Sequence, residues 1–191
     1  MSYEAYNWRD LVGKSGSLSK VIHCTNSEEP TGIYLNIEGS KESVLLASSG
    51  KSLGVRYILD IRPLVVLTNC LPVPVFFAVG GSSEDEVTFK DLNQGESAHL
   101  PQIRFGYTWM HLKIFGFRDS DWICSQLIEN EHTDVSHWKF RSVHAGIQAK
   151  FHLDINCVKS RGTYVWSIYA PFWMINKTVS SQYKNYIFSI F

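Results

Sequence analysis

The sequence lacks a surplus of charge of either sign, because eighteen lysine and arginine residues balance eighteen acidic residues. Proteins that bind nucleic acid or anionic membranes over a broad surface need an excess of basic residues. The balance argues against both as general partners and leaves only local basic patches open. The composition is 45% hydrophobic and 14% aromatic, which favours a folded core over disorder.

Cysteine is scarce, and its pattern excludes the common metal and redox motifs. The four cysteines form no C-x-x-C pair and have no histidine at zinc-finger spacing; they are Cys24, Cys70, Cys124 and Cys157. The opening MSYEAYNWRD has no apolar segment of the kind found in secretory signals. These features predict reduced, mostly buried thiols in a cytoplasmic protein.

A long helical hydrophobic run is also missing. The longest uncharged stretch, Pro63–Ser83, has Pro72 and Pro74 near its middle. Each proline removes a backbone donor and clashes with the preceding helical turn. A transmembrane helix is therefore not expected, and strands fit better.

Catalytic and metal-binding motifs are absent as well. There is no G-x-S-x-G nucleophile elbow, and the spacing of His132 and His137 suits neither a helical nor a strand metal pair. The acidic cluster Glu84–Glu86 reads as a solvated turn rather than an acid–base pair. The sequence predicts no catalytic residue, no metal ligand, no cofactor and no enzymatic activity.

What is present is an apolar alternation with a period of two. It runs through 33–37, 55–62 and 151–157, and turn-forming residues punctuate the segments between. Many short strands with frequent turns predict an all-β fold, an antiparallel β-sandwich. A short helix near Glu4–Leu11 is the one expected exception.

Two segments allow finer predictions. Apolar residues occupy odd positions from Ile103 to Trp109 and even positions from Met110 to Ile114. This change of phase predicts one long strand bent by a bulge near Trp109–His111, or two short strands. The segment PLVVLTNCLPVPVFFAV, which begins at Pro63, predicts a hairpin-like pair of strands.

One phrase occurs twice. PLVVLTN ends at Asn69 and PFWMIN ends at Asn176, 107 positions later. That spacing is about one domain length and suggests tandem modules. We expect residues 1–61 to end a preceding β repeat and 62–167 to form one complete sandwich. Residues 168–191 would then be the opening strand of a next repeat with a non-matching C-terminal tail.

The two asparagines are the candidate site residues that the repeat selects. Each follows an apolar strand, where an amide with two donors and one acceptor can fix the backbone of the next loop. The alternative is a surface-turn asparagine that happens to recur. Because the partner strands of Asn176 fall beyond the chain, replacing Asn69 should disturb folding more than replacing Asn176.

These phrases resemble a known family. RPLVVLTNCLPVPVFFAV and IYAPFWMINKT are similar to the repeat openings in the adaptor-binding domain of chorein-type bridge-like lipid transfer proteins, the vacuolar protein sorting thirteen family. The segment Leu92–Glu96, followed by His99–Pro101, resembles the glycine-centred turn within those repeats. The likeness covers about residues 55–178, and the tail VSSQYKNYIFSIF departs from it, as a truncated or aberrantly spliced product would.

The resemblance implies a non-catalytic targeting module made of about six β-sandwich repeats, each with one characteristic asparagine. It implies adaptor proteins with a proline-x-proline core as partners. It also implies peripheral attachment to organelle membranes at contact sites, with lipids handled only by the full-length protein. A groove in this repeat would draw its aromatic lining from residues that are otherwise core: Trp109, Trp122 and Trp138.

A second function remains open on sequence grounds. Trp166, Tyr169 and Trp173 cluster near the end of the chain and would suit a carbohydrate-binding or other ligand-binding β-sandwich. Binding of glycans rather than of proline-x-proline peptides would distinguish this alternative.

Overall fold

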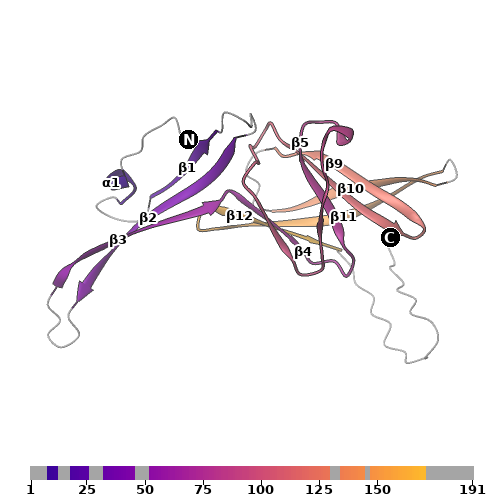
Figure 1. The fold of residues 1–191 in the computed structure, drawn as a ribbon. Helices are drawn as coiled ribbons and strands as arrows, with labels where there is room; N and C mark the ends of the chain where they lie inside the picture. The colour runs from indigo at the N-terminus through magenta and orange to yellow at the C-terminus, as the bar shows by residue number, and fades with distance from the viewer. Residues whose placement is uncertain are drawn as a thin grey trace, which may run out of the picture.

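The computed structural model describes residues 8–12, 18–25, 32–45, 52–129, 134–144 and 147–170. Strands make up most of these ranges, which confirms the all-β prediction. Figure 1 shows a small sheet that projects from a larger two-layered body.

The projecting sheet has three antiparallel strands in the order β1-β2-β3. Its elements are α1 (Trp8–Leu11), β1 (Leu18–Cys24), β2 (Ile33–Leu45) and β3 (Ser52–Pro63). Of the helix expected near Glu4–Leu11, the second half is described and is helical. Residues 4–7 lie outside the described ranges.

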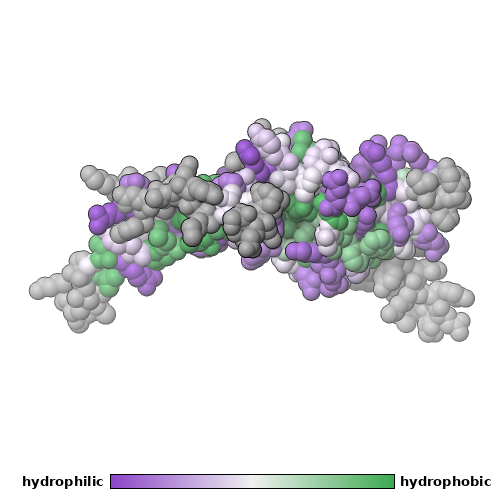
Figure 2. Space-filling view, turned by 45° about the horizontal axis from the view of Figure 1, so that its top comes forward, coloured by the Kyte–Doolittle hydropathy of each residue, from purple (hydrophilic) through white to green (hydrophobic). Residues whose placement is uncertain are grey.

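One face of β3 is apolar and open to solvent. Alternation along β3 puts four large side chains on the same face, each 43–58% exposed: Val55, Tyr57, Leu59 and Ile61. Figure 2 shows hydrophobic atoms along this projecting part of the molecule. The other face of β3 carries charged side chains, with Arg62 hydrogen-bonded to Asp60 and Arg56 3.1 Å from Glu42.

The larger body is a sheet of nine strands in the order β6-β5-β8-β9-β10-β11-β12-β4-β7. Its elements are β4 (Val65–Asn69), β5 (Val75–Gly80), η1 (Glu84–Glu86), β6 (Lys90–Leu92), β7 (Ser97–Leu100), β8 (Trp109–Phe117), β9 (Ser120–Leu127), β10 (Val135–His144), β11 (Ile147–Ser160) and β12 (Thr163–Tyr169). All described strand pairs are antiparallel except that of β12 with β4.

The nine strands fold over into two layers, where β9 and β10 share only the pair Ile123–Arg141. One layer is β6-β5-β8-β9 and the other is β10-β11-β12-β4-β7. Aromatic side chains fill the space between them: the ring of Trp122 on β9 lies 4.6 Å from that of Phe151 on β11. Burial of these rings is the main source of stability in such a core.

The hairpin-like pairing expected for residues 63–79 is wrong. β4 pairs with β12 and β7, whereas β5 pairs with β6 and β8, so the two segments lie in different layers. Between them lies Cys70–Pro74, whose prolines cannot supply the amide donors that a continued ladder needs. The chain therefore crosses from one layer to the other at this point.

The prediction of a strand that starts at Ile103 and bulges near Trp109–His111 is also wrong, both in the start of the strand and in the place of the bulge. Residues 101–108 form turns, with Gly106 at φ 80° and the amide of Arg104 hydrogen-bonded to the Thr108 hydroxyl at 2.9 Å. The strand begins only at Trp109, and its irregularity lies between Ile114 and Phe117. The change of apolar phase therefore marks the end of a turn rather than a bulge within a strand.

Hydrogen bonds join the small sheet to the sandwich. The Tyr34 amide donates to the Pro101 carbonyl at 2.7 Å, and the amide group of buried Asn36 donates to the Arg161 carbonyl at 3.2 Å. Gly162 lies against this contact at φ 76°, where an added Cβ would sit 2.1 Å from Asn36 Nδ2. A side chain at position 162 would therefore displace the Asn36 amide from its buried site.

Two glycine substitutions separate this contact from backbone strain. Gly95 has nearly the same φ, 77°, but open space around its Cβ position. We expect Gly95→Ala to lose about 1–2 kcal/mol through strain alone, and Gly162→Ala to lose about 1–3 kcal/mol more because the buried amide loses its partner. Urea unfolding of both variants measures the difference, and equal losses would show that the Asn36 contact contributes nothing.

Candidate functional site

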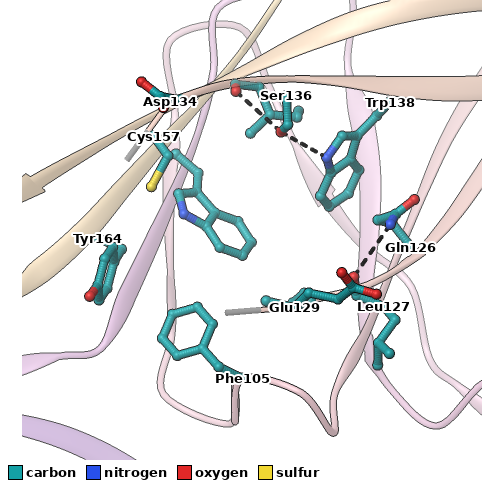
Figure 3. Close-up of a pocket in the computed structure, with 12 residues that line it drawn as sticks. Phe105, Gln126, Leu127, Glu129, Asp134, Ser136, Trp138, Cys157 and Tyr164 are labelled. Atoms are coloured by element: carbon teal, nitrogen blue, oxygen red, sulfur yellow. Dashed lines mark hydrogen bonds between the residues drawn. The ribbon is translucent and has the colours of Figure 1, made fainter. Parts of the chain in front are cut away.

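A pocket of ≈ 130 Å³ opens at one end of the sandwich and is here called the aromatic pocket. Its walls are mainly apolar and come from β9 to β12 and from the turn segment 101–108: Phe105, Ile128, Trp138, Ile155, Cys157, Tyr164 and Trp166. Its mouth is formed by Gln126, Leu127, Glu129, Asp134 and Ser136. Figure 3 shows Phe105 and Trp138 on opposite sides of the open space.

Strand register gathers the aromatic rings on one side. Cys157 and Trp166 are partners across β11 and β12, so their side chains share a face, and Tyr164 joins them two residues earlier. The rings of Trp138 and Trp166 lie 6.3 Å apart, and those of Phe105 and Tyr164 lie 5.2 Å apart. Both pairs meet edge to face, an arrangement that fixes ring orientation.

Polar atoms in the pocket are paired in ways that also hold the rings. The indole of Trp138 donates to the Ser136 hydroxyl at 3.1 Å. The Lys159 ammonium donates to the Tyr164 hydroxyl at 2.7 Å and lies 4.7 Å from the centre of that ring. The walls are therefore set before any ligand arrives, and Glu129 and Asp134 remain exposed at the mouth.

The thiols are less buried than the sequence predicted. All four are free; Cys124 and Cys157 are buried, Cys24 is half-buried and Cys70 is exposed. Burial raises the pKa of Cys124 to about 12, and burial also raises the pKa of Cys157, where a hydrogen bond with Trp166 acts in the opposite direction. A thiol with a raised pKa is a poor nucleophile, so Cys157 contributes an apolar wall rather than chemistry.

Asn69 is fully buried at the end of β4 and joins three parts of the chain. Its side-chain nitrogen donates to the carbonyls of Val73 (2.8 Å) and Leu92 (2.9 Å). Its side-chain oxygen accepts from the Leu71 amide at 2.9 Å. Its own carbonyl accepts from the amide of Gly95 at 2.8 Å, in the turn after β6. The hydrogen bonds therefore connect β4, the crossing segment and the end of β6.

The three tryptophans that the sequence predicted as the lining of a groove lie at different places in the structure. Trp138 lines the aromatic pocket, whereas Trp122 is buried beside Phe151 at a different place in the core. Trp109 is half-buried at the start of β8 and belongs neither to the aromatic pocket nor to the part of the core beside Phe151. Asn176 and Trp173 lie outside the described residues.

Sequence reasoning missed Phe105 and Tyr164 as pocket residues. Phe105 was assigned to a strand, although Gly106 directly after it is the signal for a turn. Tyr164 and Trp166 alternate on β12, and this aromatic alternation was the signal that could have placed both on one wall.

Among the described residues no three histidine, cysteine or acidic side chains gather closely enough to hold a metal ion. The described helices include none that is long and apolar enough to cross a membrane.

The fold and the pocket together define a class: an all-β sandwich domain with an aromatic pocket. The chain belongs to the family "Vacuolar-sorting associated protein 13, adaptor binding domain", whose family model matches residues 1–184. The sequence resemblance to this family is thus confirmed, and adaptor binding is the role that the family's description carries.

Two curated relatives are similar over nearly the whole chain. Intermembrane lipid transfer protein VPS13A of Mus musculus is 23% identical over 184 residues, which are 95% of this chain and 6% of that protein. Intermembrane lipid transfer protein VPS13C of Homo sapiens is 21% identical over 182 residues, which are 94% of this chain and 5% of that protein. The chain therefore spans only a small part of the relatives it matches.

Replacing the buried asparagine tests its place in the structure. Asn69→Ala leaves two carbonyls and one amide without their partner, at a cost of about 1–3 kcal/mol for each buried group left unpaired. We expect a total loss of about 3–5 kcal/mol in the free energy of unfolding. Thr68→Ala, which removes only an exposed hydrogen bond to Ser97, is the control and should cost about 1 kcal/mol or less. Similar losses in the two variants would contradict the expectation.

Proposed function

We propose that this chain is a non-catalytic targeting module of an intermembrane lipid transfer protein. It recruits that protein to organelle membranes at contact sites by binding adaptor proteins, from the cytoplasmic side and without entering the bilayer. Lipids are handled only by the full-length protein. The family match over residues 1–184 and the names of both relatives support this proposal.

The ligand in this proposal is an extended adaptor peptide with a proline-x-proline core, and the aromatic pocket takes one proline ring. An apolar cavity of about 150 Å³ holds a benzene molecule, so a pocket of ≈ 130 Å³ suits one small ring. Proline-rich segments dock in grooves lined by aromatic side chains and lose little entropy because they are already extended. The ring-sized pocket between Phe105, Trp138 and Trp166 is the observation that carries the proposal.

We also propose that the chain contains parts of more than one repeat, with boundaries near 62 and 167. β3 of the small sheet has one open apolar face and one charged face, as an outer strand of an incomplete sandwich would. The larger body starts at β4, one residue after β3 ends at Pro63, and its last described strand ends at Tyr169. In this proposal Asn69 and Asn176 are equivalent asparagines of consecutive repeats.

Peptide binding can be measured by fluorescence anisotropy with a labelled peptide that carries a Pro-Ala-Pro core. Phe105→Ala removes one wall of the pocket and should weaken binding about tenfold, equivalent to about 1.4 kcal/mol. Phe115→Ala is the control, because Phe115 is 51% exposed and packs against Phe76 outside the pocket. Its affinity should match that of the unaltered chain.

The peptide supplies the second control. An Ala-Ala-Ala core should not bind, since it offers no preformed ring to the pocket. Equal binding of both peptides, or equal effects of Phe105→Ala and Phe115→Ala, would refute the proposed site.

A further inference from the structure

A second cavity lies where the small sheet meets the sandwich, and it is here called the junction cleft. Its volume is ≈ 850 Å³, within the range of typical ligand sites. The small sheet contributes His23 and Tyr34, and the sandwich contributes residues from β5, β6 and β7 and from the turn segment 101–108.

The charged side chains that line the junction cleft, Lys90 and Arg104, are both cationic. Lys90 and Arg104 line the cleft together with His23 and His99, and no lining residue is acidic. The ion pairs found among the described residues use other cations, so none of them neutralises Lys90 or Arg104. The nearby acidic turn η1 instead points Glu84 toward Lys113 of β8, at 4.0 Å. A site of this charge favours an anionic occupant.

Contacts with aromatic rings hold Arg104 and His23 in place. The guanidinium carbon of Arg104 lies 3.9 Å from the ring centre of Tyr107. On the other wall the rings of His23 and Tyr34 stack at 4.4 Å, with only 9° between their planes. The hydrogen bond from the Tyr34 amide to the Pro101 carbonyl joins the two walls. The cleft is therefore organised before it is occupied, which lowers the entropy lost on binding.

The segment 101–108 separates the junction cleft from the aromatic pocket. Phe105 lines the pocket, whereas its neighbour Arg104 and nearby Tyr107 line the cleft. Arg104 and Phe105 are consecutive residues, with Cα atoms about 3.8 Å apart, so the two cavities adjoin at this point of the segment. One extended ligand can thus occupy both sites.

We infer that the junction cleft binds acidic residues that flank the proline core of the adaptor peptide. The inference rests on the proposed function for the peptide and adds a charge requirement to it. A peptide fits better than a bilayer surface, because the cleft is concave and walled by two sheets, whereas lipid headgroups lie on a nearly flat surface. Each exposed ion pair contributes modestly, so the two cations Lys90 and Arg104 act together.

Three labelled peptides test the inference on the 191-residue chain. All have the Pro-Ala-Pro core, and they are flanked on both sides by two glutamates, two alanines or two lysines. At low salt the glutamate-flanked peptide should bind about tenfold tighter than the alanine-flanked one. The lysine-flanked peptide should bind weakest. The preference should shrink as salt screens the charges.

A double variant locates the effect. Lys90→Ala with Arg104→Ala should abolish the preference for glutamate and leave binding of the alanine-flanked peptide unchanged. The control is Lys139→Ala with Arg141→Ala, which removes two exposed cations of β10 outside both cavities and should keep the preference. Loss of the preference in the control variant as well would overturn the assignment to the cleft.

The outcomes separate this inference from the proposed function. If all three peptides bind equally, the charge requirement is wrong and the proposed function stands. A fourth peptide has the glutamate flanks and an Ala-Ala-Ala core. If it binds as tightly as the glutamate-flanked Pro-Ala-Pro peptide, and the double variant abolishes the binding of both, the proposed proline site is wrong and only the preference of the cleft for acidic residues stands. If phosphatidylserine vesicles bind through Lys90 and Arg104 while acidic flanks add nothing, the occupant is a lipid surface and the inference is overturned.

Discussion

The buried amide of Asn69 is the interaction on which the sandwich depends most. It lies where the chain leaves one layer at β4 and crosses to the other at β5. Its side chain binds the crossing segment twice and the end of β6 once, so one residue connects both layers. An unpaired amide at this buried position would destabilise the fold more than an apolar residue would. The Asn69 side chain therefore stabilises the sandwich only when all of its hydrogen bonds are made.

The same arrangement positions the aromatic pocket and the junction cleft. β4 pairs in parallel with β12, and β12 carries Tyr164 and Trp166 into the aromatic pocket. β7 follows the turn that Asn69 holds and leads directly into segment 101–108. That segment places Phe105 in the pocket and Arg104 in the junction cleft. Segment 101–108, which separates the two cavities, thus lies a short distance along the chain from the turn that Asn69 holds. The position of segment 101–108 therefore depends on the core.

The sequence predicted the fold class well because alternation is a local signal. The apolar positions of 151–157 are the buried face of β11, and turn residues mark most strand ends. Strand pairing was not predictable in the same way: β4 was expected beside β5 but lies beside β12, about a hundred residues later. Such pairing depends on how distant parts of the chain pack together, which no local pattern encodes.

The candidate site was predictable only in part, and for the same reason. The repeated phrase selected Asn69 because its asparagine stood out against apolar neighbours. Of the three tryptophans nominated, Trp138 lines the pocket, and its neighbours there come from β9, β11, β12 and a distant turn. The junction cleft had no sequence signature at all, since His23, Lys90 and Arg104 come together only through the packing of two sheets.

Native-state hydrogen exchange of the Leu71 amide tests the central role of the Asn69 side chain most directly. Leu71 lies in a bend of the crossing segment, outside the strands, where amides normally exchange through small local fluctuations. Its amide nevertheless donates to the Asn69 side-chain oxygen at 2.9 Å. If the hydrogen bonds of the Asn69 side chain open only when the sandwich unfolds, Leu71 will exchange with the same opening free energy as the Leu67 amide in the centre of β4. Exchange at the rate of a free turn, with Leu67 still protected, would contradict this central role.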